Sequence, residues 1–546
     1  MLCMSTPWQQ VYDPLNSSFW STLTAALPVV VLLTLLASGK LRVHVAALVT
    51  LALSLAIAIW IFGMPASSAA MSAVNGAAYG LMPIGWMVVN IIFLHRLTVE
   101  RGWFDLLKGQ LSQLAPDPRV QVVLIAFCFG AFFEGTAGFG APVAVTAALL
   151  MQLGFAPLQA CGLSLIANTA PVAFGSMGTP LIALNGVTGI DLLELSKMAG
   201  RQLPVFSFII PFWVVGAFAG WRGLREVWPV AFVAGLGFAL PQYLVSNFHG
   251  PWLVDIISGL ISLGAVVLLL QFWSPAGSSR RTTATGPKSP DSLRCWIPWL
   301  VLCLFVFAWG MKPVRDALDG IWTSKWEIPQ LHQMVQRTAP VAPATAPPEE
   351  AVLKLNLLST TGTGIFLAAI VSGLLMGFSP VKLALIYWQN LKRLRLSLIT
   401  ICAMLALGYV TKFSGMDATL GLALAQTGWM YPFFGSMLGW LGVALTGSDT
   451  ASNVLFGSLQ TITAQQVGVS PTLMASANSV GGVMGKMIDA QSIVVASAAT
   501  NWHGNEGGIL RFVFWHSLIL ACLVGLFVML QAYVWPFNLM VIPGGG

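Results

Sequence analysis

Two long stretches of this chain are almost free of charge, and this feature most limits what the chain can fold into. Positions 120–190 contain one charged side chain, Glu134, and positions 418–485 contain one, Asp449. An apolar run of roughly 20 residues is long enough to cross a bilayer as a helix. A carboxylate within such a run is costly, so it faces a protein interior or an aqueous cavity and marks an ion or substrate path. Two such acids in similar glycine-rich surroundings indicate a transport site that is built twice.

Composition agrees with a membrane protein. Hydrophobic residues make up 57% of the chain and charged residues 8%, against about 25% charged in ordinary soluble domains. Val45–Gly63, Val227–Phe248 and Phe512–Asn538 are further runs without Asp, Glu, Lys or Arg. We therefore predict an all-α polytopic membrane protein with about 12–14 transmembrane or re-entrant helices. The net charge of +7 lies mostly in loops between helices and needs no nucleic-acid partner.

The motifs of several other chemistries are missing from the sequence. The seven cysteines show no CxxC spacing, and the six histidines are scattered. No HExxH, phosphate-binding loop or Cys/His cluster is present. We expect no cofactor, no metal site and no enzymatic activity, and a self-contained ATP-driven pump is disfavoured.

Basic residues orient the chain, because cytoplasmic loops carry an excess of Lys and Arg. The residues before Lys40 contain neither. The basic segments are Lys40–Arg42, Arg96–Arg119, Arg222–Arg225, Arg280–Arg294 and Lys382–Arg395. This pattern places the N-terminus outside and these segments in the cytoplasm.

The two halves of the chain repeat. Gly102, Glu134, Pro157 and Asn168 correspond in order to Gly415, Asp449, Pro471 and Asn478, at offsets of 313, 315, 314 and 310. The helix before Gly102 ends in the basic segment at Arg96, whereas the helix before Gly415 begins after the basic segment at Arg395. The chain thus enters the membrane at this motif from the cytoplasmic side in the first half and from the outer side in the second half. Such a reversal is typical of inverted-topology repeats with a binding site near the midplane.

This organisation divides the chain into six parts. We expect N-terminal helices at 1–80, a first repeat at 81–200, connecting helices at 201–311, an extracytoplasmic loop at 312–360, a second repeat at 361–500 and a C-terminal helix at 501–546.

Both solitary acids lie in segments that make poor continuous helices. Glu134 is followed by Gly135, Gly138, Gly140 and Pro142, and Asp449 is preceded by Gly447. Glycine and proline break helices or allow close backbone approach. Non-helical backbone persists at membrane depth only where protein or a cavity surrounds it. We predict hairpin tips or helix breaks at both places, with packing hinges as the alternative.

Polar side chains near these breaks are candidates for binding a small carboxylate. The candidates are Asn168, Thr169, Ser448, Thr450, Asn453, Asn478, Ser479 and Lys486. Amide and hydroxyl groups can hold a carboxylate and a hydroxyl without a formal cation, and Lys486 adds a positive charge. The alternative is that these groups join helices across the bundle.

Glu134 and Asp449 are the candidates for proton coupling. Burial disfavours the ionised form of a carboxyl group, so either acid could take up a proton near neutral pH. Glu134, among glycines and aromatic residues, is the preferred carrier. A structural acid remains the alternative for each, and Asp449 with its neighbouring hydroxyls could also coordinate Na⁺.

At these motifs the chain resembles the bacterial L-lactate permease family, also called the lactate/glycolate permease family. The likeness rests on the sequence at 127–142, 168–175, 439–450 and 485–488. It implies uptake of L-lactate, with D-lactate and glycolate, in symport with protons across the bacterial cytoplasmic (inner) membrane. It also implies kinship to transporters with inverted repeats and an elevator-like movement.

The resemblance implies few partners besides the bilayer. These are protons, L-lactate and related 2-hydroxy monocarboxylates, and we also allow for a homodimer. A sodium-coupled or uncoupled carrier or channel for other small carboxylates remains the alternative.

Overall fold

The fold is almost entirely helical. The computed structural model describes residues 7–37, 41–112, 117–136, 138, 140–275, 294–343, 346–502 and 505–542. Of the predicted basic segments, Lys40 and positions 113–116 and 280–293 lie outside the described residues.

The first part of the chain contains β1 and ten α-helices. Their bounds are β1 Trp8–Gln9, α1 Ser18–Ala37, α2 Val43–Trp60, α3 Ala66–Tyr79, α4 Trp86–Glu100, α5 Trp103–Ser112, α6 Pro118–Val122, α7 Gly130–Thr136, α8 Ala141–Gln152, α9 Pro157–Ala167 and α10 Gly175–Thr188. Shorter or wider helical turns are η1 Gly80–Gly85, η2 Val123–Phe129 and η3 Val172–Phe174.

The remainder follows the same pattern. Its α-helices are α11 Leu192–Phe248, α12 Val254–Phe272, α13 Ile297–Gly310, α14 Lys312–Ile321, α15 Thr361–Leu375, α16 Pro380–Ser414, α17 Met416–Ala425, α18 Tyr431–Thr446, α19 Asp449–Val467, α20 Pro471–Gly485, α21 Ala490–Ala499 and α22 Glu506–Tyr533. Short turns are η4 Arg294–Trp296, η5 Gly428–Met430 and η6 Phe537–Met540, and the strands are β2 Ser324–Glu327, β3 Val335–Gln336 and β4 Val352–Leu355.

Several of these helices suit a bilayer. Within the described residues, six helical segments are long and apolar enough to cross a membrane, or up to eight if two bent helix pairs each form one span. Five shorter apolar helices accompany them. The chain is therefore a helical, multi-pass membrane protein, as predicted. The expected total of 12–14 crossing or re-entrant helices stays a prediction.

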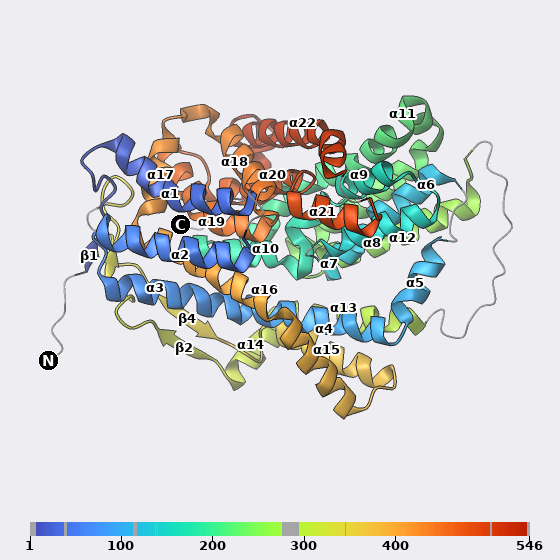
Figure 1. The fold of residues 1–546 in the computed structure, drawn as a ribbon, viewed down its shortest axis with the longest axis horizontal. Coiled ribbons are helices and arrows are strands. Elements are labelled where there is room, and N and C mark those ends of the chain that lie inside the picture. Colours follow the sequence, from blue (N-terminus) through green and yellow to red (C-terminus); the bar gives the residue numbers. More distant parts are fainter. Residues whose placement is uncertain are drawn as a thin grey trace.

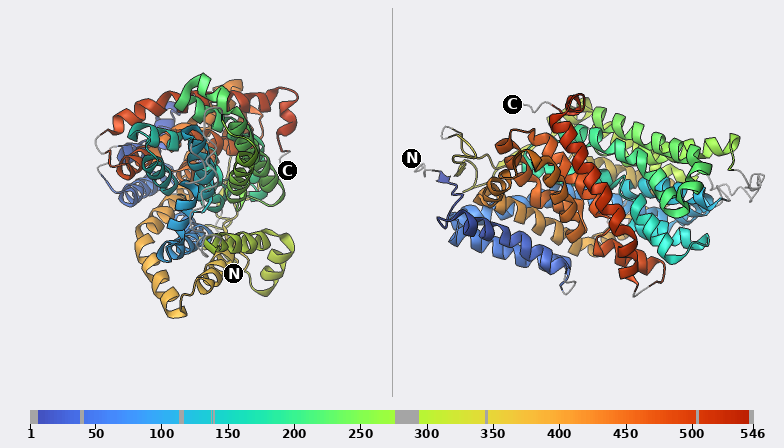
Figure 2. Two further views of the ribbon diagram at one scale, coloured as in Figure 1. Left: turned by 90° about the vertical axis from the view of Figure 1, so that its right-hand side faces the viewer. Right: turned by 90° about the horizontal axis from the view of Figure 1, so that it is seen from above.

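The strands form two small sheets, which the all-α prediction did not include. β1 pairs with β3 in parallel, and β2 pairs with β4 antiparallel. Three of the four strands belong to the segment 312–360, which the sequence indicated as a polar loop. β1, β2 and β4 lie at one end of the molecule, with the N-terminus, whereas α5 and α6 lie toward the opposite end (Figure 1). Seen from above, α22 runs diagonally across the other helices (Figure 2).

Glycines allow α18 and α20 to pack with their backbones in contact. A Cβ on Gly439 would lie 2.0 Å from Asn478 O, and one on Gly481 would lie 2.1 Å from Ser436 O. Small residues at such spacing let membrane helices approach closely, where van der Waals packing replaces the hydrophobic effect as the driving force. This contact holds the helix that precedes Asp449 against the helix that precedes Lys486.

We expect Gly439→Ala to lower stability by about 1–3 kcal/mol, as overpacking does, because the atoms it meets are backbone and cannot move aside. The matched control is Gly216→Ala in α11, where a Cβ meets no atom within 4 Å. Thermal unfolding of both purified variants in detergent measures the difference. Equal unfolding temperatures for the two variants would contradict a close-packed α18–α20 contact.

Candidate functional site

Glu134 lies just before a break between two helices. It occupies the last turn of α7, which ends at Thr136, and α8 begins at Ala141. Gly138 and Gly140 have φ values of 57° and 81°, a region that glycine adopts without steric cost. Pro142 follows in the first turn of α8, where its missing N–H is not needed. The break therefore falls on the glycines that the sequence singled out, except Gly135, which is still helical.

Asp449 lies directly after the equivalent break in the second half. Gly447, with φ of 72°, ends α18, and Asp449 is the first residue of α19. The Ser448 hydroxyl caps α19 by accepting a hydrogen bond from Ala451 N at 3.2 Å. A helix N-terminus carries partial positive charge, which suits an acid or a bound anion.

Two further breaks follow the acids. Between α9 and α10 the chain bends by 64°, and Ser176, Met177 and Gly178 have φ values of 44°, 61° and 75°. Left-handed backbone at non-glycine residues stores about 1–3 kcal/mol of strain each and clusters at functional sites. In the second half, the break between α20 and α21 contains Lys486 and Asp489.

The four breaks meet around one small cavity of about 80 Å³. This volume equals that of a few water molecules in the liquid. Residues from both halves line it: Glu134, Val172, Gly175, Ser176, Thr179, Pro180, Gly447, Ser448, Asp449, Thr450, Lys486 and Gln491. The structure thus brings together both predicted acids and three of the predicted binding residues, Ser448, Thr450 and Lys486.

A larger cavity adjoins this one. It measures about 320 Å³ and shares Thr179, Ser448, Thr450 and Gln491 with the small cavity. Its other walls come mainly from α16, between Leu396 and Leu405, and from His44 at the start of α2. The lining residues on α2 and α16 directly follow the basic segments 40–42 and 382–395 in the sequence. The larger cavity therefore extends from the small cavity toward the basic, N-terminal parts of α2 and α16.

Hydrogen bonds hold the Asp449 carboxylate in place. Asp449 Oδ2 accepts bonds from the Ser479 hydroxyl and, at 3.5 Å, from Asn453 Nδ2. Asn453 Nδ2 also approaches Pro180 O at 3.2 Å, which connects α19 to α10. Gly482 leaves room for the acid, since a Cβ there would lie 2.5 Å from Asp449 Oδ1. Asn453 and Ser479 therefore support Asp449 and do not line the cavity.

Asn478 lies further from the cavity, in a polar network between helices. Its Nδ2 donates to Asn453 Oδ1 at 2.9 Å, and its Oδ1 accepts from Gln460 Nε2 at 3.0 Å. Tyr431 OH in turn donates to Gln460 Oε1 at 2.6 Å. The Thr169 hydroxyl, just past the end of α9, donates back to Ile166 O at 2.8 Å. In this conformation Asn478 joins helices, Thr169 bonds to the end of α9, and neither lines the cavity.

Lys486 supplies the positive charge of the cavity. Its ammonium group donates to Gly447 O at 2.6 Å and lies 3.2 Å from Asp489 Oδ2. Asp489 Oδ1 also caps α21 by accepting from Ser492 N at 2.7 Å. Among the described residues that line the cavity, Lys486 is the one cation. It connects the break at Gly447 to the break at Asp489.

Glu134 has fewer hydrogen-bond partners than Asp449. Its Oε2, like Asp449 Oδ1, makes no hydrogen bond within the described part of the chain, whereas Asp449 Oδ2 accepts two. Asn168 lies within interaction range of the Glu134 carboxyl group, yet neither polar atom of its side chain has a hydrogen-bond partner among the described residues. Gly175 packs on the other side, since a Cβ there would lie 2.7 Å from Glu134 Oε1.

Sequence reasoning missed several residues of this region. Ser176, Thr179 and Gln491 line the cavity, and only Ser176 had a signal, as the counterpart of Lys486 in the first half. Asp255 on α12 was also missed, although positions 227–279 contain no other charged side chain. The criterion of a solitary acid in an apolar stretch applies to it as it does to Glu134.

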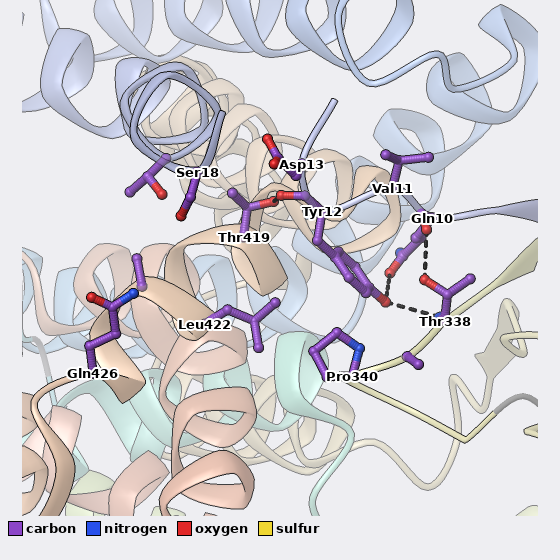
Figure 3. Close-up of a pocket in the computed structure, with 13 residues that line it drawn as sticks. Gln10, Val11, Tyr12, Asp13, Ser18, Thr338, Pro340, Thr419, Leu422 and Gln426 are labelled. Carbon is purple, nitrogen blue, oxygen red and sulfur yellow. Dashed lines mark hydrogen bonds between the residues drawn. The ribbon is translucent and has the colours of Figure 1, made fainter. Parts of the chain in front are cut away.

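A further pocket lies elsewhere, near the strands (Figure 3). It measures about 450 Å³ and is lined by the N-terminal segment Gln10–Asp13, by Thr338–Pro340 and by α17. The Thr338 backbone N–H donates to Tyr12 OH at 3.1 Å, and the Thr419 hydroxyl to Tyr12 O at 3.1 Å. Asp13 is the one charged residue among its lining residues. The pocket shares no residue with the cavity between the acids, so we do not assign the anion site to it.

Solved structures offer only a distant likeness. The Alcanivorax borkumensis YdaH transporter is 15% identical, with a TM-score of 0.41 over 84% of this chain and 86% of that chain. Neisseria gonorrhoeae MtrF, described as one of a class of antimetabolite efflux pumps, is 14% identical, with a TM-score of 0.42 over 85% of this chain and 83% of that chain.

Sequence relatives match over nearly the whole chain. The glycolate permease GlcA of Escherichia coli is 46% identical, covering 96% of this chain and 98% of its own. The L-lactate permeases of Escherichia coli and Bacillus subtilis are 45% and 42% identical, each covering 96% of this chain, and 98% and 99% of their own lengths. The family model described as L-lactate permease matches residues 21–535. The chain belongs to the L-lactate permease family.

Proposed function

We propose that this protein is a secondary active transporter that imports L-lactate, together with D-lactate and glycolate, in symport with protons. The observation that carries this proposal is the cavity in which the four breaks meet, lined by Lys486, Glu134 and Asp449. Relatives at 45% and 46% identity named L-lactate permease and glycolate permease support the substrate class.

The charges around the cavity suit an anion that arrives with a proton. Lys486 attracts a carboxylate, and Ser448, Thr450 and the start of α19 offer hydrogen-bond donors to it. The anion's negative charge disfavours a second ionised carboxyl nearby, so its binding favours the protonated form of Glu134 or Asp449. By linkage, protonation of either acid strengthens binding of the anion by the same factor. This reciprocity is the physical basis of symport.

The arrangement of elements supports two inverted repeats. α6, which leads to the break at Glu134, lies toward one end of the molecule, and α17, which precedes the helices around Asp449, lies toward the other (Figure 1). The two acid-bearing breaks are thus approached from opposite ends. This agrees with the proposed first repeat at 81–200 and second repeat at 361–500.

Helix packing supports an elevator-like movement. α3, α4, α13, α15 and α16 pack among themselves. The helices around the cavity form a second group, in which α18, α19 and α20 contact one another, α10 packs on α19 and α20, and α22 packs on α18 and α20. We propose that the second group carries the cavity past the first, across the bacterial inner membrane, with the N-terminus and the strands outside.

We expect Glu134→Gln and Asp449→Asn to separate the two candidate proton carriers. The variant that replaces the carrier loses lactate accumulation driven by a pH gradient, because an amide does not exchange a proton. Asp316→Asn, at an exposed position of α14, is the control and keeps accumulation. The measurement is the ratio of internal to external lactate in proteoliposomes. If both site variants concentrate lactate as the wild type does, the assignment of the carrier is wrong.

The same assay tests the alternatives. Accumulation that follows a sodium gradient at constant pH favours a sodium-coupled carrier. Uptake by the wild type that never exceeds equilibrium favours an uncoupled carrier or channel and contradicts symport.

We expect Lys486→Gln to raise the KM for lactate by roughly tenfold to a hundredfold, as loss of a charge-assisted hydrogen bond of about 1.5–3 kcal/mol predicts. Lys382→Gln, at an exposed position of α16, is the matched control. A wild-type KM for Lys486→Gln would show that Lys486 does not bind the substrate.

Lys486→Gln also leaves the buried Asp489 carboxylate without its partner, which costs about 3–5 kcal/mol of stability. The double variant Lys486→Gln/Asp489→Asn removes that buried charge as well. A KM that stays high in the double variant separates loss of substrate binding from loss of stability.

A further inference from the structure

Asp255 is a buried acid that the cavity does not account for. It lies in the first turn of α12, is 1% exposed, and neither of its carboxyl oxygens makes a hydrogen bond within the described part of the chain. Its side chain does not cap α12, whose N-cap residue is Leu253. Burying an ionised carboxylate without a partner is so costly that such a group is neutralised by a proton or another cation.

Close packing brings Asp255 next to Glu134. A Cβ on Gly135 would lie 2.8 Å from Asp255 Cβ, and one on Gly259 would lie 2.6 Å from Phe132 N, so α12 and α7 meet backbone to backbone. The two acids are near enough to interact electrostatically. Glu134 lines the cavity, whereas Asp255 lies beside Glu134 and is not part of the lining.

A third polar side chain points to the same place. Asn168, at the end of α9, is 2% exposed, and both its amide oxygen and its amide nitrogen are without hydrogen-bond partners among the described residues. It lies within interaction range of the Glu134 carboxyl group. Most buried polar groups in proteins are hydrogen-bonded. Three neighbouring side chains with unsatisfied buried atoms, from α7, α9 and α12, therefore indicate a site for a small ligand.

We propose that Asp255, Glu134 and Asn168 form a buried site that binds the co-transported proton, and that Asp255 is a second coupling acid. Two carboxyl groups so close together do not readily both ionise, so the pair binds a proton when an anion occupies the cavity and releases it when the anion leaves. The Asn168 side chain has both a hydrogen-bond donor and an acceptor, so it can bond to the Glu134 carboxyl group in its protonated or its ionised form. Asp255 acts through Glu134 and does not touch the substrate.

Few other titratable groups face this end of α12. The elements packed against α12 are α7, η2, α10 and α11. α7 contributes Glu134, η2 contributes Cys128, and α10 contributes none. α11 carries Tyr243 in its last turns, with His249 directly after it, and carries further along its length Glu194, Lys197, Arg201, Arg222, Arg225 and Glu226. Lys486 interacts electrostatically with Glu134 from the break after α20. The Glu134–Asp255 pair is thus the acidic centre of this region.

The proposal rests on proton-coupled uptake, and Asp255→Asn tests it separately. Removing the second acid makes ionised Glu134 more favourable, so the pH profile of lactate uptake shifts toward acidic pH by about one unit or more, as coupled titration predicts. Accumulation driven by a pH gradient falls, whereas exchange of internal for external lactate at equal pH stays at the wild-type level. A merely structural acid would lower protein stability and leave the pH profile in place.

The control is Asp417→Asn, which removes another buried acid from the first turn of a helix, α17, away from the cavity. It keeps the wild-type pH profile. Asp255→Glu keeps a titratable group, so it restores accumulation driven by a pH gradient, with a pH profile displaced from that of the wild type because its longer side chain changes the distance to Glu134. If Asp255→Asn concentrates lactate with an unchanged pH profile, Asp255 is not a coupling acid, although symport itself still holds.

Two other outcomes also decide the matter. If the sodium dependence of uptake changes in Asp255→Asn while its pH profile does not, the site binds a metal cation and not a proton. That result overturns the proposal. A wild-type protein that never concentrates lactate would instead overturn the proposed function. If Asp255→Asn fails to fold, Asp255→Glu alone decides, because a longer side chain changes the distance to Glu134 and must alter the pH profile of a coupled pair.

Discussion

The cost of burying charge away from water governs this structure. Within two long apolar stretches, each acid must lie where protein groups, a proton or a bound ion compensate its charge. Asp449 meets this demand through the Ser479 hydroxyl and the Asn453 amide. Lys486 meets it through Gly447 O and Asp489. Glu134 has no comparable set of partners. The helix breaks therefore meet at one place because the charged groups have no other acceptable surroundings.

Glycine makes this meeting place sterically feasible in two different ways. At Gly140 and Gly447 it supplies left-handed backbone that ends one helix and turns into the next. At Gly175 and Gly482 it supplies space, because a Cβ would collide with the carboxyl groups of Glu134 and Asp449, respectively. The same residue type thus fixes both where the backbone turns and how near it comes to each acid. Placing polar groups between these membrane helices therefore requires glycine at these positions.

Sequence reasoning located the acids and the breaks well and the side-chain partners poorly. Solitary acids stand out because lipid-length stretches tolerate so few of them, and left-handed turns require glycine. The direction in which a side chain points is set by packing, so Asn478, an obvious counterpart of Asn168, lies in a network with Gln460 instead of the cavity. Asp255 carries the same signal, as the one charged side chain in positions 227–279, so the criterion itself could have found it.

Glu134 and Asp449 are not equivalent, and their surroundings explain why. Asp449 sits at a helix N-terminus with a hydroxyl and an amide, which stabilise the ionised form and hold the carboxylate in one orientation. Glu134 sits in the last turn of α7, beside a second carboxyl group and an amide whose polar atoms are unsatisfied. The surroundings of Glu134 stabilise its ionised form less, so they favour a carboxyl group that takes up and releases a proton. Under the proposed symport, we therefore assign the anion to the break at Asp449 and the proton to the surroundings of Glu134.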